Sequence, residues 1–224
     1  MDVHTYADKR RGIVYMDTPG LVDRTAERVA ADAITRALRS SGPRVKLCFV
    51  TRLQYGRVVS EDLVTIERIL DSLHVPDVAF GIIINCVGHA ACRKLATDRH
   101  EFERLAALIN SGKYITPHLL VIPQIEALID QDNCVVELPR GARSALDQFP
   151  TTFLPMGSLV EISVDGFAGS VDRTKGCVAT LERDKELLYS VQRQLEHKRP
   201  DFWAIAATAL GAIGTVVKMA IDFL

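Results

Sequence analysis

The chain is organised around the segment Ile13-Val14-Tyr15-Met16-Asp17-Thr18-Pro19-Gly20-Leu21. Its apolar run is too short for a helix and predicts a buried strand that ends at Asp17. Pro19 and Gly20 predict a tight turn that leads into a helix. Ligands of open α/β sheets bind where the strands end, so Asp17 is placed to hold Mg²⁺ through a water molecule. Gly20 lets a backbone N–H approach a phosphate, because glycine has no Cβ.

Strand and helix patterns alternate beyond this segment. Three further apolar runs predict buried strands, at 45–50, 78–84 and 118–122. Amphipathic segments between the strands predict helices, and each is preceded by a residue that caps helices well: Asp23, Ser60 and Asp98. The residues between Asn85 and Asp98 are expected to form a loop. This order predicts an α/β fold with a mostly parallel sheet and helices on both of its faces.

The pattern changes beyond Pro150, and the chain is expected to divide into four regions. Residues 1–150 form the α/β domain, 151–176 a strand-and-loop extension with its strand at 158–164, 177–199 an amphipathic helix, and 200–224 a hydrophobic tail helix. The amphipathic helix has a narrow apolar seam, at Leu181, Leu188, Val191 and Leu195. Such a seam is typical of a helix that lies on its own domain or on a partner.

Hydrophobic residues are concentrated in the tail. No charged residue occurs from Phe202 through Val217, and continuing to Ile221 gives about the twenty residues that cross a hydrocarbon core. Trp203 and the basic residues 197–199 lie at one end, as expected at a cytoplasmic membrane face. The run is rich in Ala and Gly, however, so two alternatives to membrane association through 202–224 stay open: a helix packed over the sheet, and an amphipathic helix lying on a surface.

The overall charge is balanced, with 27 basic and 28 acidic residues, and shows no nucleic-acid-binding footprint. Five cysteines without an amino-terminal signal peptide predict free thiols in a reducing, cytoplasmic compartment. Cys48 and Cys134 lie in apolar runs and are expected to pack as small hydrophobic residues. Cys86, His89 and Cys92 do not have the spacing of the paired ligands in structural zinc sites.

Two motifs resemble those of known GTPases. Met16–Leu21 resembles the third G-box of TRAFAC-class GTPases. The Thr18-Pro19 pair within it narrows the range of GTPases that the segment resembles. Gly56–Asp62, followed by Leu63 and Ile66, resembles the extra box peculiar to the avirulence-induced-gene GTPases. These proteins, also called immune-associated nucleotide-binding proteins, are kin to the chloroplast-import (TOC) GTPases and more distantly to septins. The resemblance covers about residues 1–125.

The resemblance implies a P-loop-NTPase-like G domain that binds GTP or GDP with Mg²⁺. Asp17 would hold the Mg²⁺ through water, Thr18 would belong to the same loop, and the Gly20 N–H would sense the γ-phosphate. Asn85 falls at the first position of the fourth G-box, which binds the base. Leu21 stands where Ras-like proteins carry a water-orienting Gln. This implies slow hydrolysis, or catalysis assembled by a homodimer through the switch face.

Two departures from the family pattern limit this reading. Cys86, Val87 and Gly88 follow Asn85, so the Lys and Asp that recognise guanine are absent. No Gly-x-x-x-x-Gly-Lys-Ser/Thr occurs anywhere in the sequence, so the β- and γ-phosphates lose most of their positive partners. The G domain is therefore incomplete in this sequence, which is either a fragment or a truncated relative.

The sequence predicts a GTP-binding protein of the avirulence-induced-gene type, with weak or no hydrolysis as written. GTPase activity is implied only by the resemblance to this family, and no catalytic residue can be assigned. The alternative is a non-enzymatic pseudo-GTPase, an interaction module that keeps the sheet and the switch surface. A third alternative is an unrelated α/β domain in which Asp-x-x-Gly occurs by chance, and the second motif argues against it.

Overall fold

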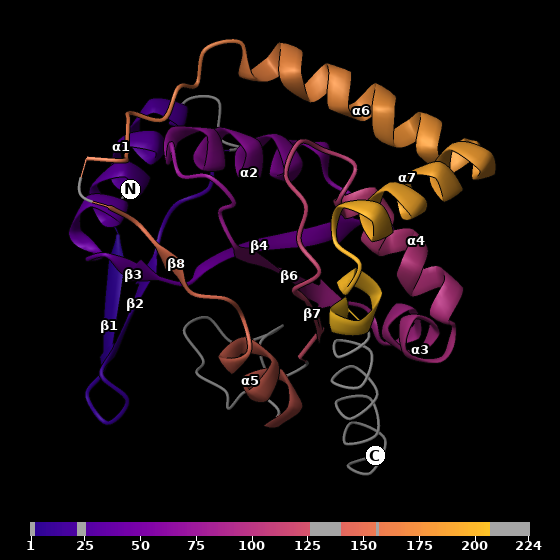
Figure 1. The fold of residues 1–224 in the computed structure, drawn as a ribbon, viewed down its shortest axis with the longest axis horizontal. Helices are drawn as coiled ribbons and strands as arrows, with labels where there is room; N and C mark the ends of the chain where they lie inside the picture. Colours follow the sequence, from indigo (N-terminus) through magenta and orange to yellow (C-terminus); the bar gives the residue numbers. More distant parts are fainter. Residues whose placement is uncertain (1–2, 22–25, 126–139, 156, 207–224) are drawn as a thin grey trace.

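The computed structural model describes residues 3–21, 26–125, 140–155 and 157–206. A four-stranded sheet with the order β5-β4-β6-β7 forms its central layer. Figure 1 shows the strands and helices, which are β1 (His4–Asp8), β2 (Ile13–Asp17), α1 (Glu27–Ser40), β3 (Arg44–Val45), β4 (Leu47–Gln54), β5 (Arg57–Val58), α2 (Ser60–Ser72), β6 (Phe80–Val87), α3 (His89–Thr97), α4 (Arg99–Ile109), β7 (Leu119–Pro123), α5 (Arg140–Asp147), β8 (Thr152–Phe153), α6 (Phe167–Arg183) and α7 (Lys185–Lys198).

The central sheet is mixed but mostly parallel. Strands β4, β6 and β7 run parallel, and the short β5 pairs antiparallel with the end of β4. These three parallel strands correspond to the runs predicted at 45–50, 78–84 and 118–122. The expected α/β fold with a mostly parallel sheet is therefore confirmed.

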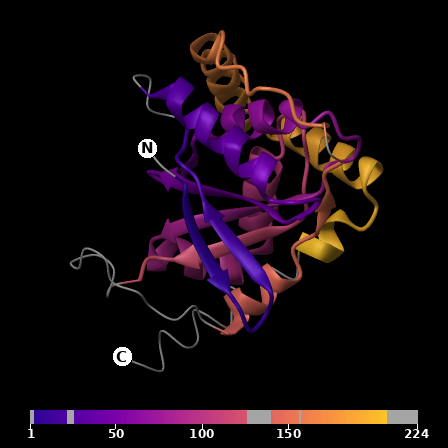
Figure 2. The ribbon, with the colours of Figure 1, turned by 90° about the vertical axis from the view of Figure 1, so that its left-hand side faces the viewer.

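The strand that ends at Asp17 forms, but the prediction that it is buried in the parallel sheet is wrong. β2 instead pairs antiparallel with β1 in a separate two-stranded sheet, with Tyr6 opposite Tyr15. The hairpin is largely exposed, and Val14 and Tyr15 are 55% and 49% accessible. Figure 2 shows it running from the side of α1 towards α5.

A nearby partner explains this pairing. Residues 4–8 supply a strand directly before the turn, and the Asp8 carboxylate accepts hydrogen bonds from the backbone N–H groups of Arg10 and Arg11. Gly12 adopts a positive φ of 64°, which glycine tolerates best. Closing such a short loop costs little chain entropy, so local hairpin pairing competes well with a distant strand.

The main hydrophobic core lies on one face of the central sheet. Ile82, Ile84 and Val121 point to this face, where they meet buried residues of α2, α3, α4, α6 and α7. A second cluster joins Leu21 and α1 to α2 and the start of α6. The apolar residues along one side of α2 and at its C-cap are all buried: Leu63, Ile66, Ile69, Leu70 and Leu73.

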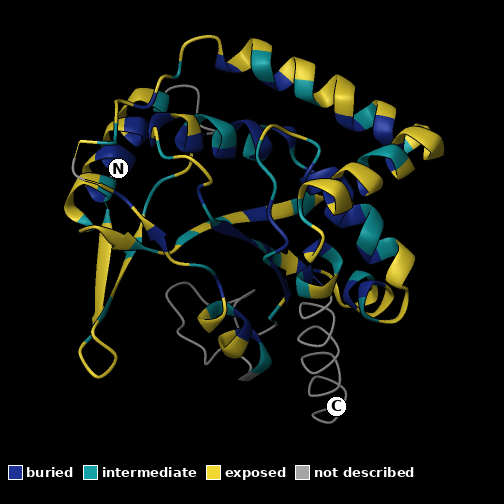
Figure 3. Ribbon diagram, in the orientation of Figure 1, coloured by how far each residue is buried: buried dark blue, intermediate teal, exposed yellow. Residues whose placement is uncertain are grey.

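The described residues cover the opposite face of the sheet only in part. Neighbouring residues of a strand point to opposite faces, so Leu120 and Ile122 turn away from the main core and pack under α5. Helices therefore lie on both faces of β6 and β7. Alternate residues of β4 remain exposed, as Figure 3 shows, and Val50 is 61% accessible. Cys48 is also exposed, so its predicted packing in an apolar environment is wrong, and Cys134 lies outside the described residues.

Two of the three predicted helix caps can be tested. Asp98 caps α4 as predicted, since its carboxylate accepts from the N–H groups of His100 and Glu101 at 3.0 and 3.3 Å. Ser60 is not the cap of α2; it is the first helical residue, after Val59, and its side chain is buried. The third predicted cap, Asp23, lies outside the described residues, and α1 starts after Ala26.

Three predictions in the remaining segments are corrected. The residues between Asn85 and Asp98 include α3 rather than only a loop, because Cys92 and Leu95 supply a short apolar face that packs into the core. Residues 158–164 form no strand. The single helix predicted over 177–199 is two helices, because Asp184 leaves the helical conformation and caps α7 through the Leu187 N–H at 3.0 Å.

The apolar seam of α6 and α7 lies on the rest of the chain, as one of the two sequence-based alternatives proposed. Leu181, Leu188 and Leu195 belong to the main core, and Val191 packs against it. Phe202 and Ala206 are fully buried in the same cluster. The start of the hydrophobic tail therefore packs against the α/β core, whereas residues 207–224 of the predicted tail helix lie outside the described part of the chain.

Candidate functional site

The first motif lies at the end of the β1–β2 hairpin. Asp17 is the last residue of β2, opposite His4, and is exposed. Its carboxylate makes no hydrogen bond or ion pair with another described residue. An exposed, unengaged carboxylate can bind a hydrated cation, although a single one binds weakly.

Gly20 and Leu21 differ sharply in their surroundings. A Cβ placed on Gly20 would meet no heavy atom within 4 Å, so the fold itself does not require glycine here. Leu21 is fully buried in the cluster formed by α1, α2 and α6. Its apolar side chain therefore anchors the motif to the helical layer, and it does not stand in the open where a residue would orient water.

The second motif forms a corner between β4 and α2. Tyr55 and Gly56, with φ of 51° and 78°, make the two-residue turn from β4 to β5, and such a turn favours glycine. The Thr51 hydroxyl donates a hydrogen bond to the Asp62 carboxylate, which ties β4 to the first turn of α2. Val58 is buried in the main core. The motif therefore has a structural role in this chain.

The Asp62 carboxyl lies in a partly enclosed position. Burial raises the pKa of Asp62, whereas the hydrogen bonds from the Thr51 hydroxyl and the Arg52 backbone oppose this rise. A carboxylate placed in this way is stabilised by two donors within its own corner. It is engaged by the fold and is not available to a metal ion.

The third predicted position, Asn85, lies near the end of β6. Its side-chain oxygen accepts a hydrogen bond from the Cys86 N–H at 2.9 Å. Cys86 has a positive φ of 56°, and the register with β7 shifts between Ile84 and Val87. The side-chain oxygen of Asn85 thus stabilises a strand irregularity. Its side-chain amide nitrogen remains to donate to a nucleotide base.

The structure joins the two motifs through their flanking residues but keeps the predicted ligands apart. Leu21, the last residue of the first motif, belongs to the same buried cluster as Val64, which follows the second motif. Asp17 belongs to the hairpin and Asn85 to the central sheet, and no hydrogen bond or ion pair among the described residues links them. Within the described ranges, no three His, Cys, Asp or Glu side chains gather as a metal site.

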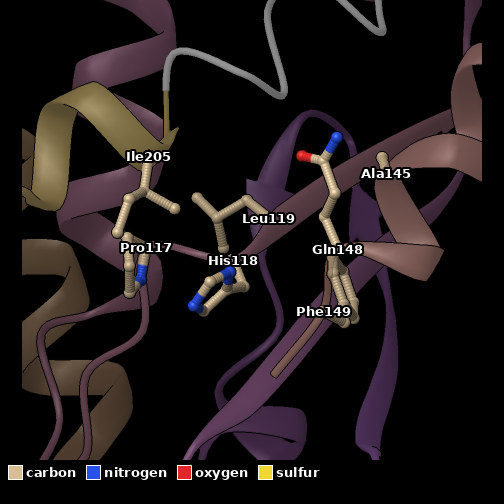
Figure 4. Close-up of a pocket in the computed structure, with 7 residues that line it drawn as sticks. All are labelled: Pro117, His118, Leu119, Ala145, Gln148, Phe149 and Ile205. Carbon is tan, nitrogen blue, oxygen red and sulfur yellow. The ribbon is translucent and has the colours of Figure 1, made fainter. Parts of the chain in front are cut away.

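Sequence reasoning missed a close contact under α5. A Cβ on Gly81 would lie 2.1 Å from the Phe149 ring, so the ring rests directly on the backbone of β6. Phe149 also lines a small cavity of about 60 Å³ with Gln148, His118 and Ile205. Figure 4 shows His118 between the Ile205 side and the Phe149 side of this cavity. The available signal was a glycine inside a strand pattern, which marks a close approach of neighbours.

The chain was compared with models of protein families, with curated proteins and with solved structures, and none of them matches it.

Proposed function

We propose that this chain is an incomplete G domain of the avirulence-induced-gene type that binds Mg²⁺ and guanine nucleotide weakly and does not hydrolyse GTP by itself. The observation that supports this proposal is a buried cluster shared by the last residue of the first motif and the helix that follows the second. Leu21 and Val64 belong to one buried cluster, which also contains residues of α1 and Ile69 of α2. Chance motifs in an unrelated domain would have no reason to converge on the same helix.

The residues present fit part of a nucleotide site. Asp17 would hold Mg²⁺ through water, and the N–H at Gly20 would approach a phosphate, because the space around that glycine is open. Thr18 would position this turn between them. Bound Mg²⁺ would neutralise phosphate charge, which is the usual role of the metal in phosphoryl chemistry.

The residues around Asn85 fit a guanine base poorly, and this is why weak binding is proposed. The Asn85 carbonyl already accepts from Cys86, and no Lys or Asp follows in the positions that recognise guanine. A site that offers the phosphates only the Gly20 N–H and a Mg²⁺ ion held at Asp17 lacks the positive charge that a phosphate loop and its Lys provide. Hydrolysis is therefore not part of the proposal.

The test is an NMR titration of the full chain with a non-hydrolysable GTP analogue, with and without Mg²⁺. We expect small, Mg²⁺-dependent shifts at Thr18 and Gly20 at millimolar nucleotide, and their loss in Asp17→Ala. Asp32→Ala removes an exposed carboxylate from α1 and is the matched control. Equal shifts in both variants would refute the site. Micromolar affinity that depends on Asp17 would refute the proposed weakness.

A non-enzymatic interaction module is the second candidate, and the exposed part of β4 favours it. The side of β4 away from β6 has no strand partner over Leu47–Arg52 among the described residues. Unpaired strand edges bind other strands readily. If the titration shows no nucleotide effect while the chain binds a polypeptide, this second candidate replaces the first.

Two partners remain proposals: a homodimer through the face around residues 17–21, and a membrane through the tail. Among the described residues, no helix combines the length and the apolar character needed to cross a bilayer. Deletion of 207–224 leaves the buried Phe202 and Ala206 in place. Carbonate extraction of the tagged full chain and of this deletion tests the tail: membrane association predicts that only the full chain stays in the pellet.

A further inference from the structure

The exposed face of β4 carries a regular pattern. Every second residue from Arg44 to Gln54 is exposed, whereas the residues between them are buried or half-buried over β4. The exposed stripe has cations towards its ends and small apolar side chains at its centre: Arg44, Lys46, Cys48, Val50, Arg52 and Gln54. Val50, in the centre, is 61% accessible although its neighbour in β6 is Ile83.

Over Leu47–Thr51 the same strand has a hydrogen-bonding edge that no described strand occupies, whereas the backbone of Arg52 bonds to the Asp62 carboxylate. β4 pairs with β6 from Leu47 to Arg52, and with β5 only at Leu53 and Gln54. No other described strand pairs with β4. Because backbone groups of a strand point alternately to its two sides, half of the N–H and C=O groups over six residues face away from β6. Such an edge is a template for another strand.

The neighbouring elements leave this edge flanked rather than paired. The tip of the β1–β2 hairpin reaches the end of α5, where Arg11 bonds to the Asp147 carboxylate. Lys46, the second residue of the stripe, donates to the Asp147 carbonyl at 2.6 Å. The hairpin and α5 therefore meet beside the amino end of β4. From Leu47 to Arg52 the strand edge has no partner among the described strands.

We propose that the β4 edge over residues 46–52 binds an extended segment of a partner protein that has apolar residues at its centre and acidic residues at its ends. Main-chain hydrogen bonds along the edge would supply affinity, as in other strand-addition complexes. The partner's apolar side chains lie beside Cys48 and Val50. Its acidic side chains lie beside Lys46 and Arg52, since cross-strand neighbours of opposite charge stabilise the pair.

This inference does not rest on nucleotide binding. It uses the pairing of β4 and the charge of its exposed face, and neither involves Asp17, Gly20 or Asn85. Failure of the nucleotide titration therefore leaves it untouched, and failure of strand binding leaves the nucleotide proposal untouched.

The probe is the seven-residue peptide Glu-Thr-Val-Thr-Val-Thr-Glu with blocked ends, titrated into the isotopically labelled full chain. Its sequence is the same in both directions, so it presents acids and valines correctly to parallel and antiparallel pairing. We expect NMR shifts centred on residues 47–52. The control peptide replaces both acids with lysine, and we expect it to bind roughly tenfold more weakly, since two charge pairs become repulsive.

A charge reversal in the protein makes the test specific. Arg52→Glu should weaken binding of the acidic peptide roughly fivefold and strengthen binding of the lysine peptide, because the cross-strand pair changes sign. Arg36→Glu reverses an exposed cation on α1 and should change neither. A peptide methylated on the backbone nitrogens of alternate residues should bind only when the methyl groups point away from β4.

Two results would overturn the proposal. One is equal binding of the acidic and lysine peptides, or of both methylated forms, because charge and edge pairing would then be irrelevant. The other is a dimer of the chain in sedimentation that Val50→Glu disrupts and that excess peptide does not. In that case the occupant of the edge is a second copy of this chain.

Discussion

Arg11, at the tip of the β1–β2 hairpin, donates a hydrogen bond to Asp147 at the end of α5, with 2.5 Å between Nη2 and Oδ1. The two residues are 136 positions apart in the sequence. The hydrogen bond and charge of Arg11 lower the pKa of Asp147, and Lys46 donates to the carbonyl of the same residue. Asp147 therefore links the hairpin, the start of β4 and α5.

The Arg11–Asp147 contact predicts a local effect on the hairpin. In Arg11→Ala, we expect faster amide hydrogen exchange in β1 and β2 and an unchanged melting temperature, because exposed ion pairs contribute little to global stability. A two-stranded hairpin is marginally stable by itself and depends on such contacts. Arg10→Ala is the matched control, since only the backbone N–H of Arg10 is bonded. Equal exchange in both variants would show that the contact does not hold the hairpin.

Gly81→Ala should destabilise the protein through α5. The new Cβ would lie 2.1 Å from the Phe149 ring, and an aromatic ring packed against a strand cannot move aside without losing its contacts. Such overpacking costs about 1–3 kcal/mol. Chemical denaturation measures the loss. We expect amide exchange to rise first in α5.

Two variants check the cause of that loss. Gly88→Ala places a Cβ where no heavy atom lies within 4 Å, and it should leave stability nearly unchanged. In the Phe149→Ala background, Gly81→Ala should cost little, since the clash partner has been removed. Additive losses in the double variant would show that the contact between Gly81 and Phe149 is not the reason.

The parts of the fold that the sequence predicts are those with local signals. The strands β4, β6 and β7 are apolar runs bounded by turn residues, and the cap of α4 is a side chain next to the backbone groups it binds. The pairing of β2 depends on which strand reaches it, and an apolar run does not encode that choice. For the same reason, the exposure of Val50 could not be predicted: it depends on what covers β4.

The candidate site follows the same division. The motifs at Asp17–Gly20 and Gly56–Asp62 are found from residue types and spacing. The positive φ of Gly56 in the turn after β4 explains why a glycine occupies that position. The Thr51–Asp62 hydrogen bond and the burial of Leu21 are tertiary contacts, and nothing in the local sequence marks them. They show that several motif residues serve the fold, which the motif pattern alone does not reveal.

Asp98→Ala should destabilise α4 by about 1 kcal/mol, the usual effect of losing an N-cap. Asp98 accepts from two backbone N–H groups, whereas Glu101 pairs with Lys94 and Arg104 and the Asp98 N–H donates to the Lys94 carbonyl. Asp98→Asn keeps a capping oxygen and should recover most of the loss. Thermal denaturation of the three proteins tests this. Equal destabilisation by Ala and Asn would point to the charge of Asp98 rather than to its hydrogen bonds.

His118 predicts an acid-sensitive contribution to stability. Burial between β7, α5 and the 200–206 segment lowers the pKa of His118, and the positive charge of Arg199 adds to this while Asp201 opposes it. The unfolded chain, with an ordinary histidine pKa near 6.5, then takes up the proton first. The contribution of His118 is fully present above about pH 6.5 and is lost as the pH falls through the lowered pKa of the folded protein.

This contribution is measured by denaturing the wild type and His118→Gln between about pH 7.5 and 5. That range spans the ordinary histidine pKa near 6.5. We expect the wild type to lose stability faster on acidification, because glutamine does not titrate. An NMR titration of the His118 ring reports its pKa directly. Arg199→Gln should raise that pKa and Asp201→Asn should lower it, in keeping with the sign of each charge. A ring that titrates above 6.5 in the wild type would refute the assignment, because the proton would then stabilise the folded chain.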